Sequence, residues 1–159
     1  MKTTIFVCFL LSLALFGCST SAPVAEVAEP LSGERARLRV ISDQTVYLIP
    51  GHCAVLGPGS GHVSGFKGRS LGMPTGPTQA KNGNVAELYV KAGSPLSLVS
   101  SRQGCTIRGS FVPKANEDYE VVVEFSWGSS KCSLQAWKIG KENTPIFVTL
   151  VPYNSPSCR

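Results

Sequence analysis

The sequence predicts an all-β protein: a single small β-sandwich of seven or eight short antiparallel strands with a long glycine-rich loop. Apolar residues alternate with a period of two rather than 3.6 over much of the chain. Clusters of Gly, Pro, Asn and Ser separate these stretches at short intervals, as turns do. No later stretch has the pattern of an amphipathic helix. An open barrel is the alternative arrangement of the same strands.

The clearest strand is expected over residues 119–127. Its alternate apolar residues predict one buried face, whereas Glu120 and Glu124 are expected on the solvated face. Further strands are expected at residues 37–40, 46–49, 86–91, 96–100, 106–112, 131–139 and 146–151. The glycine-rich segment 57–84 is expected to be a flexible loop with one short strand near residues 62–66.

The N-terminal residues indicate the cellular compartment. Lys2 and the apolar run of about 12 residues at 5–16 match a secretory signal peptide, and the run is too short to span a bilayer. It ends in Leu15-Phe16-Gly17-Cys18, which resembles the lipobox of bacterial lipoproteins, although Phe16 is bulkier than the usual residue there. The resemblance implies a diacylglyceryl group on Cys18. The alternative is an ordinary signal cleaved after Ala22, which would discard Cys18.

Three segments are therefore expected. Residues 1–17 form a lipoprotein signal peptide, residues 18–34 a lipidated flexible tether, and residues 35–159 the β-sandwich domain. Without the signal the chain keeps 15 − 1 = 14 basic residues against 10 acidic ones, a net charge of +4. This mild excess permits weak attraction to anionic lipid or peptidoglycan, and no basic stripe suited to nucleic acid is present.

Four cysteines remain in the expected domain, namely Cys53, Cys105, Cys132 and Cys158. An even number in an exported domain predicts two disulfides, and three connectivities are open. In a simple meander Cys105 and Cys132 would lie two strand spacings apart, about 9.6 Å. A disulfide spans at most about 7 Å between Cα atoms. A Cys105–Cys132 bond therefore requires facing sheets or another strand order.

The polar residues do not form a recognisable catalytic or metal-binding group. His52 and His62 are the only histidines, and adjacent strand residues such as His52 and Cys53 point to opposite faces. Glu120 and Glu124 are about 13 Å apart along one strand, too wide for a glycosidase pair. We therefore expect no catalytic residues, cofactor or metal.

A contact surface is the remaining candidate for a site. Lys67 and Arg69 lie at the centre of the glycine-rich segment, where they could meet a phosphate or carboxylate. Trp137 has the opposite parity to its apolar neighbours, so it is the best aromatic candidate for a contact surface if that face is exposed.

Several short phrases occur in an order that resembles a family of uncharacterised bacterial lipoproteins, of expected Gram-negative origin. They are residues 46–53, 69–74, 92–96, 105–113, 118–121 and 132–134. The resemblance covers most of residues 37–139 and implies export and a small cysteine-containing β domain, but no activity. Asn116-Glu117 stands where members often have glycine, and Asn tolerates the left-handed conformation.

These observations favour a cell-envelope lipoprotein that acts as a non-enzymatic interaction or structural module. With Ser19 rather than Asp after the cysteine, the expected location is the outer membrane, facing the periplasm. An envelope protein or a glycan is the expected partner. One alternative is an inhibitor or ligand-binding lipoprotein that uses the glycine-rich loop, and another is a small envelope enzyme.

Overall fold

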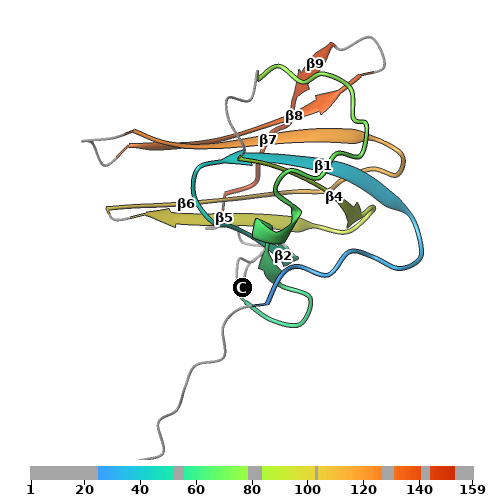
Figure 1. Ribbon diagram of the computed structural model, residues 1–159, viewed down its shortest axis with the longest axis horizontal. Coiled ribbons are helices and arrows are strands. Elements are labelled where there is room, and N and C mark those ends of the chain that lie inside the picture. Colours follow the sequence, from blue (N-terminus) through green and yellow to red (C-terminus); the bar gives the residue numbers. More distant parts are fainter. Residues whose placement is uncertain are drawn as a thin grey trace, which may run out of the picture.

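Two β-sheets packed face to face form the described part of the protein in the computed structural model (Figure 1). The structure describes residues 25–51, 56–78, 84–102, 104–126, 131–140 and 144–152. Its strands are β1 Arg35–Ser42, β2 Val46–Pro50, β3 Gly61–His62, β4 Val85–Lys91, β5 Leu96–Arg102, β6 Cys105–Phe111, β7 Asp118–Phe125, β8 Cys132–Ile139 and β9 Pro145–Phe147. One 3-10 turn, η2, covers Ser64–Phe66. The predicted all-β sandwich is confirmed.

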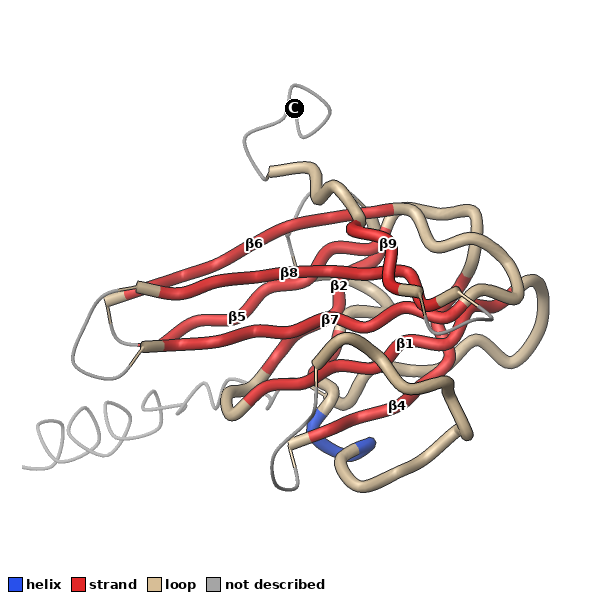
Figure 2. The backbone as a smooth tube through the Cα atoms, turned by 90° about the horizontal axis from the view of Figure 1, so that it is seen from above, coloured by secondary structure: helices blue, strands red, loops and turns tan. Residues whose placement is uncertain are grey.

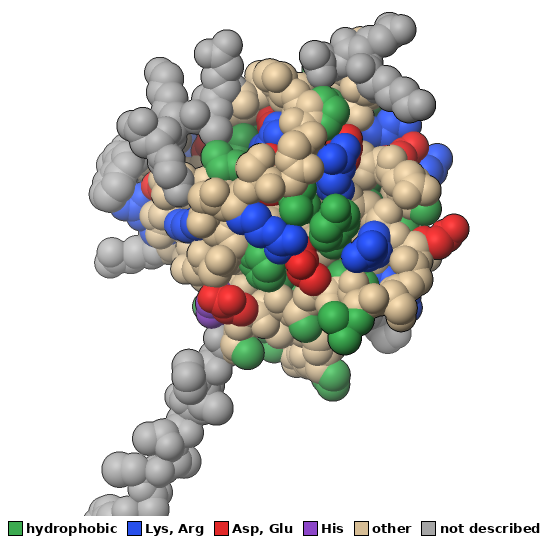
Figure 3. All heavy atoms as spheres, turned by 45° about the vertical axis from the view of Figure 1, so that its right-hand side comes forward, with side chains coloured by type: hydrophobic (Ala, Val, Ile, Leu, Met, Phe, Trp, Pro, Cys, Tyr) green, Lys and Arg blue, Asp and Glu red, His purple; other side chains and the backbone are tan. Residues whose placement is uncertain are grey.

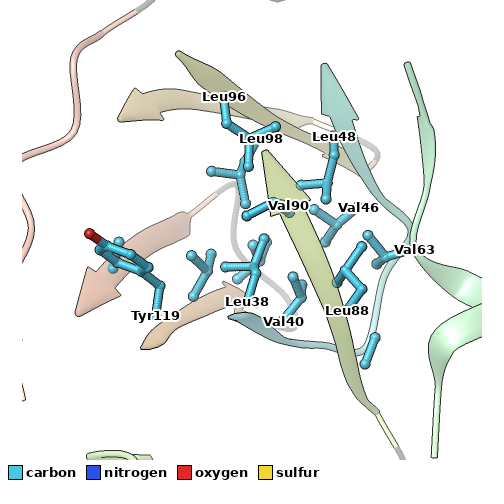
Figure 4. Packing of buried hydrophobic residues seen from close by; sticks show 14 of the residues in the cluster. Leu38, Val40, Val46, Leu48, Val63, Leu88, Val90, Leu96, Leu98 and Tyr119 are labelled. Carbon is cyan, nitrogen blue, oxygen red and sulfur yellow. The ribbon is translucent and has the colours of Figure 1, made fainter. Parts of the chain in front are cut away.

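The larger sheet has the strand order β4-β1-β7-β8-β9 and the smaller sheet the order β3-β2-β5-β6 (Figure 2). Alternate residues of both sheets point into the space between them, as the period of two predicts. Leu38 and Leu88 from the larger sheet meet Leu48 and Leu98 from the smaller one, and all four are fully buried (Figure 4). Burial of this apolar layer is the main force that holds the sheets together.

One strand pairing differs from the prediction of antiparallel strands. β1 and β7 pair in parallel, with Leu38 opposite Tyr119, whereas the other pairings between named strands are antiparallel. After β1 the chain visits both sheets before it returns to form β7 beside β1. Such a long crossover permits parallel pairing, which a short hairpin does not.

Residues 25–29, expected to belong to the flexible tether, make ordered contacts with the domain, whereas residues 31–34 are exposed. The backbone N–H of Val27 donates to the carbonyl of His62 (3.0 Å), and that of His62 donates to Ala25 (3.1 Å). The Glu29 carboxylate accepts the N–H of Tyr89 in β4 (2.6 Å), and Val27 packs against the core. The N-terminal segment thus joins an edge of the smaller sheet to an edge of the larger one.

The strand expected at residues 146–151 is also shorter than predicted. β9 ends at Phe147, and the chain then crosses to the smaller sheet, where Val151 and Ser110 exchange backbone hydrogen bonds (2.8 and 3.0 Å). Val148 and Leu150 pack against the core during this crossing. The free edge of β6 is thus occupied at Ser110, which hinders its pairing with other chains there.

A disulfide joins Cys105 at the start of β6 to Cys132 at the start of β8, with a Cα–Cα distance of 6.3 Å. The two strands belong to facing sheets, which is one of the arrangements that this bond requires. Cys18, Cys53 and Cys158 lie outside the described residues, as do the signal peptide and residues 18–24. Within the described part of the chain, no helix is long and apolar enough to cross a membrane.

Candidate functional site

The outer face of the larger sheet carries an unusual row of charged and aromatic side chains. In register across β4, β1, β7, β8 and β9 lie Glu87, Arg39, Glu120, Trp137 and Phe147. The neighbouring row contains Tyr89, Arg37, Asp118, Ile139 and Pro145. Acidic and basic residues therefore alternate across β4, β1 and β7 at spacings that favour cross-strand ion pairs.

Residues 69–78, which we call the strap, cross this face as an extended segment. Arg37 and Arg39 donate hydrogen bonds to strap carbonyls, and Glu87 and Glu120 accept strap N–H groups. Met73, itself a strap residue, is buried. The sheet thus holds the strap mainly by its backbone, so the outward-facing strap side chains can vary without loss of these bonds.

Arg39 lies at the centre of the charged cluster. Its Nε donates to Glu87 Oε1 (2.8 Å), and its Nη1 donates to Glu120 Oε2 (3.1 Å) and to the carbonyl of Pro74 (3.0 Å). Its Nη2 donates to the carbonyl of Met73 (3.3 Å). The planar guanidinium suits this arrangement because its donors point in several fixed directions at once.

The two carboxylates are shared between Arg39 and the strap. The N–H of Leu71 donates to Glu87, and the N–H of Thr78 donates to Glu120 Oε1 (3.0 Å). The Glu120 residue is 0% exposed. A buried carboxylate is costly unless it is paired and hydrogen-bonded, and this one is both.

Arg37 and Asp118 form a second pair at the edge of the cluster. Arg37 Nε and Nη2 donate to the two oxygens of Asp118 (2.6 and 2.7 Å), a bidentate geometry. This hydrogen bonding raises the pKa of Arg37 above its ordinary value, against a smaller lowering by burial. Its Nη1 donates to the carbonyl of Leu71 (3.1 Å), so Arg37 binds the strap near its start and Arg39 binds it near its middle, at Met73 and Pro74.

Glycine at position 76 allows the strap to approach the sheet. A Cβ atom added there would overlap the carboxylate of Glu120. The expectation of a flexible loop is therefore corrected for the strap, which is an ordered cover. At least one of the glycines that predicted flexibility instead permits close backbone contact. Of the short strand expected near residues 62–66, only His62 lies in a strand, β3, and Ser64–Phe66 form the 3-10 turn η2 instead.

The predicted position of Glu120 on a solvated face is wrong, although Glu124 is exposed as expected. The parity was right, since Glu120 does point away from the core, but the strap covers that face. A signal for this was present in the sequence. Arg37 and Arg39 are two residues apart and therefore point to the same face of one strand, and Asp118 and Glu120 do the same on another. Two basic residues can thus face two acidic residues across neighbouring strands.

Lys67 precedes the strap and Arg69 begins it, and the two side chains have different surroundings. Lys67 is exposed and pairs with Ala86 at the edge of β4 through the backbone. Arg69 Nη1 lies 2.9 Å from Glu29 Oε1, and its guanidinium stacks on the ring of Phe66 at 5.6 Å. Arg69 therefore binds the N-terminal segment to the start of the strap.

Trp137 is half-buried rather than freely exposed. It meets the ring of Phe147 edge to face, with centroids 6.3 Å apart and an interplanar angle of 85°. Phe147 is 62% exposed, so it is the more accessible member of this aromatic pair. The two rings continue the charged row beyond the strap. Trp127 lies outside the described residues.

The other polar candidates do not converge. The Nδ1 atom of His62 is buried without a hydrogen-bond partner, and its ring meets that of Tyr47 at 6.5 Å. His52 and Cys53 lie outside the described residues. Among the residues that the structure describes, no three His, Cys, Asp or Glu side chains come together to hold a metal ion.

An open hollow of about 560 Å³ lies beyond the end of the strap, lined in part by Ser42, Thr78, Asn84 and Glu124. Its polar groups come from strand ends and turns.

No protein-family model matches the chain, and no curated protein or solved structure is significantly similar to it. The function must therefore be argued from the residues and their geometry.

Proposed function

We propose that the protein is a cell-envelope lipoprotein, anchored through Cys18, whose sandwich domain is a non-enzymatic interaction module. The lipobox-like sequence supports the anchor, and the expected location is the outer membrane, facing the periplasm. The strap supports the interaction role. The expected partner is another envelope protein or a glycan.

The observation that carries this proposal is how the buried charges are used. Arg39, Glu87 and Glu120 bond one another and the strap backbone. An enzyme needs polar groups that reach a substrate, whereas these groups hold a surface segment in place. Exposed strap residues such as Thr75 and Pro77 then form a pre-ordered contact surface, and a pre-ordered surface loses less entropy on binding.

Two measurements on protein made in its own host test the proposal. The first is the intact mass of protein extracted from membranes, which should begin at Cys18 and include acyl groups. A mass beginning near Pro23 without lipid would contradict the anchor. The second is photo-crosslinking in intact cells, with the crosslinker placed at Thr75 and, as a control, at the exposed Thr106 of β6.

A specific envelope product from position 75 but not from position 106 would support the interaction role. Equal or absent crosslinking at both positions would count against the strap as the contact surface. If the purified protein turned over an envelope substrate and one substitution abolished that activity, the protein would be an enzyme and the non-enzymatic role would be rejected.

The order of the strap also favours a second candidate, an inhibitor that inserts this segment into a hydrolase. Deleting residues 61–78 cannot test it, because the deletion would leave Arg37 and Arg39 without their strap partners. Substituting the outward-facing Thr75 and Pro77 with Asp changes the surface and keeps the backbone bonds. Loss of inhibition with an unchanged melting temperature would favour the inhibitor.

A further inference from the structure

One end of the sandwich, which we call the loop end, gathers most of the connections. It comprises the described residues 30–35, 56–60, 91–95, 112–117, 138–140 and 144–146. The connections touch one another: Ala92 N–H donates to Glu34 (3.0 Å) and Gly93 N–H to Pro113 (2.8 Å). The disulfide lies at the opposite end, beside the starts of β6 and β8. The loop end is at the right in Figure 1.

Exposed apolar side chains concentrate at this end. Leu31 is 100% exposed, and the other large hydrophobic residues with high exposure are Leu56, Val112, Ile146 and Phe147, between 45% and 62%. The first four belong to the loop end, and Phe147 follows it directly on β9. In the described part of the opposite end, no large hydrophobic side chain is exposed to this degree.

Two apolar hollows lie between these loops. One, of about 220 Å³, is lined by Pro30, Pro50, Gly59, Lys91 and Pro95 among others. The other, of about 350 Å³, lies between Val112 and Ile146, with Lys114 and Lys138 on its walls. The apolar side chains therefore project around shallow depressions, each with lysine at its margin.

The charge of the loop end is positive. Its described residues include four basic side chains, Arg35, Lys91, Lys114 and Lys138, against two acidic ones, Glu34 and Glu117, a net charge of +2. Lys138 pairs with Glu117 (2.8 Å), while Lys91 and Lys114 are exposed. Figure 3 brings this side of the molecule forward and shows apolar side chains interspersed with Lys and Arg and with some Asp and Glu.

We propose that the loop end is a membrane-docking surface that rests in the headgroup region of an anionic lipid leaflet. Apolar side chains that project separately from several loops, flanked by lysines, match a surface that is apolar and negatively charged at once. The positive charge complements anionic headgroups. This inference goes beyond the contact role of the strap but rests on the proposed membrane anchor for its setting.

This docking would fix the orientation of the domain. With the loop end on the membrane, the outer face of the larger sheet would face sideways, along the membrane surface, and not toward the lipid. The strap would then remain open to a partner while the loop end holds the domain down.

The experiment compares lysine reactivity in the mature protein on vesicles of phosphatidylethanolamine and phosphatidylglycerol with that in solution. A water-soluble amine reagent and peptide mass analysis give the rate at each lysine. Lys91 and Lys114 should react about fivefold more slowly on vesicles, which corresponds to about 1 kcal/mol for a lysine near an anionic surface. The exposed Lys131, at the disulfide end, should keep its rate.

Substitutions connect the protection to the apolar side chains. Leu31→Asp with Leu56→Asp should abolish protection of Lys91, because both leucines are exposed and project where the lipid would lie. Thr106→Asp adds an acidic group on an exposed strand position at the other end and should leave protection unchanged. An unchanged melting temperature would show that neither change unfolds the domain.

The outcomes separate the inference from the proposed anchor. A lipid-free mass with vesicle binding that depends on Leu31 and Leu56 would retain the docking surface and reject the anchor. A lipidated protein whose lysines react equally on vesicles and in detergent solution would overturn the docking surface and retain the anchor. Protection in native membranes but not on protein-free vesicles would also overturn it, in favour of a protein partner.

Discussion

The strap-covered face and the loop end both contain arginine or lysine beside carboxylates, but the charges do different things. Arg39 beneath the strap is surrounded by Glu87, Glu120 and strap carbonyls. Lys91 and Lys114 at the loop end are exposed beside apolar side chains. The first group holds the protein's own chain, whereas the second is open to another surface.

Burial explains the difference. A charge removed from water must find partners within the protein, and once it has them it is no longer available to a ligand. An exposed charge contributes little to stability but remains free to attract a partner. In such a domain a binding surface is therefore expected where exposed charges lie beside exposed apolar groups, and not only where charges are numerous.

The largest expected effect on stability comes from disrupting the buried charges beneath the strap. Arg39→Met leaves Glu87 and Glu120 buried without their cation, and we expect a loss of about 3–5 kcal/mol in the free energy of unfolding. Urea unfolding followed by circular dichroism measures this loss. Adding Glu87→Gln and Glu120→Gln should recover much of it, because the uncompensated charges are then gone. A loss below about 1 kcal/mol for the single variant would mean that the cluster is not structurally important.

Removal of the disulfide provides a reference loss of stability, because the bond lies in neither the strap-covered face nor the loop end. Cys105→Ser with Cys132→Ser opens a bond between residues 27 apart, and the chain-entropy relation gives a loss of about 3.5 kcal/mol. Protease resistance of the strap should be kept in this variant under conditions where the protein is folded. Faster strap cleavage there would mean that general stability, rather than the charged cluster, orders the strap.

A smaller effect is expected where the strap meets the sheet. In Gly76→Ala the new methyl group must displace the Glu120 carboxylate or the strap, and we expect a loss of about 1–3 kcal/mol. Limited proteolysis should then cut within residues 69–78 sooner than in the wild type. Thr75→Ala, at an exposed neighbouring position, is the matched control and should change stability by less than about 0.5 kcal/mol.

The smallest effect is expected from the ion pair at the loop end. Burial alone would raise the pKa of Glu117, but hydrogen bonds from Lys138 (2.8 Å) and Tyr119 (2.6 Å) outweigh it and lower that pKa below 4.5. Because the folded-state pKa is lowered, the carboxylate stabilises the fold above pH 4.5 and loses this contribution as the pH falls further. Glu117→Gln should flatten this acid dependence and cost about 0.5 kcal/mol at neutral pH, measured by urea unfolding across pH. An effect as large as that of Arg39→Met would remove the contrast between the two regions.

The hydrogen bond from Tyr119 to the same Glu117 carboxylate can be tested at alkaline pH. Burial, with the hydrogen bond to Glu117, raises the pKa of Tyr119 to about 12. A raised folded-state pKa means that the contribution is complete below the ordinary value of 10.0 and is lost as the pH rises through about 12. Ultraviolet titration should show one tyrosine ionising late, and Glu117→Gln should bring it forward. Identical titration curves for the two proteins would argue against this hydrogen bond.

Alternation of residues predicted most of the strands because each strand has one face on the core. Tyr119, Val121 and Val123 point inward as their spacing requires, and the strand boundaries follow the turn residues. Local patterns report such local geometry. The same patterns cannot report what covers the outer face, since the cover comes from a segment far away in the sequence.

The strap is the clearest example. Its glycines and prolines have the composition of a flexible loop, and the bonds that order it come from Arg37, Arg39, Glu87 and Glu120 on three different strands. Those partners are between 16 and 42 residues away from the strap positions that they bond. Only the folded sheet brings them to one surface.

The sequence by itself determined most of the β-strands, the inward and outward sides of the clearest ones and the cysteines available for pairing. These depend on the two-residue repeat of a strand and on residue chemistry, which a single chain displays locally. Tertiary structure alone decided the parallel pairing of β1 with β7, the burial of Glu120, the Cys105–Cys132 bond and the gathering of exposed apolar side chains at one end. Each of these depends on which distant segments become neighbours. That arrangement is stabilised by pairing and packing contacts distributed over both sheets.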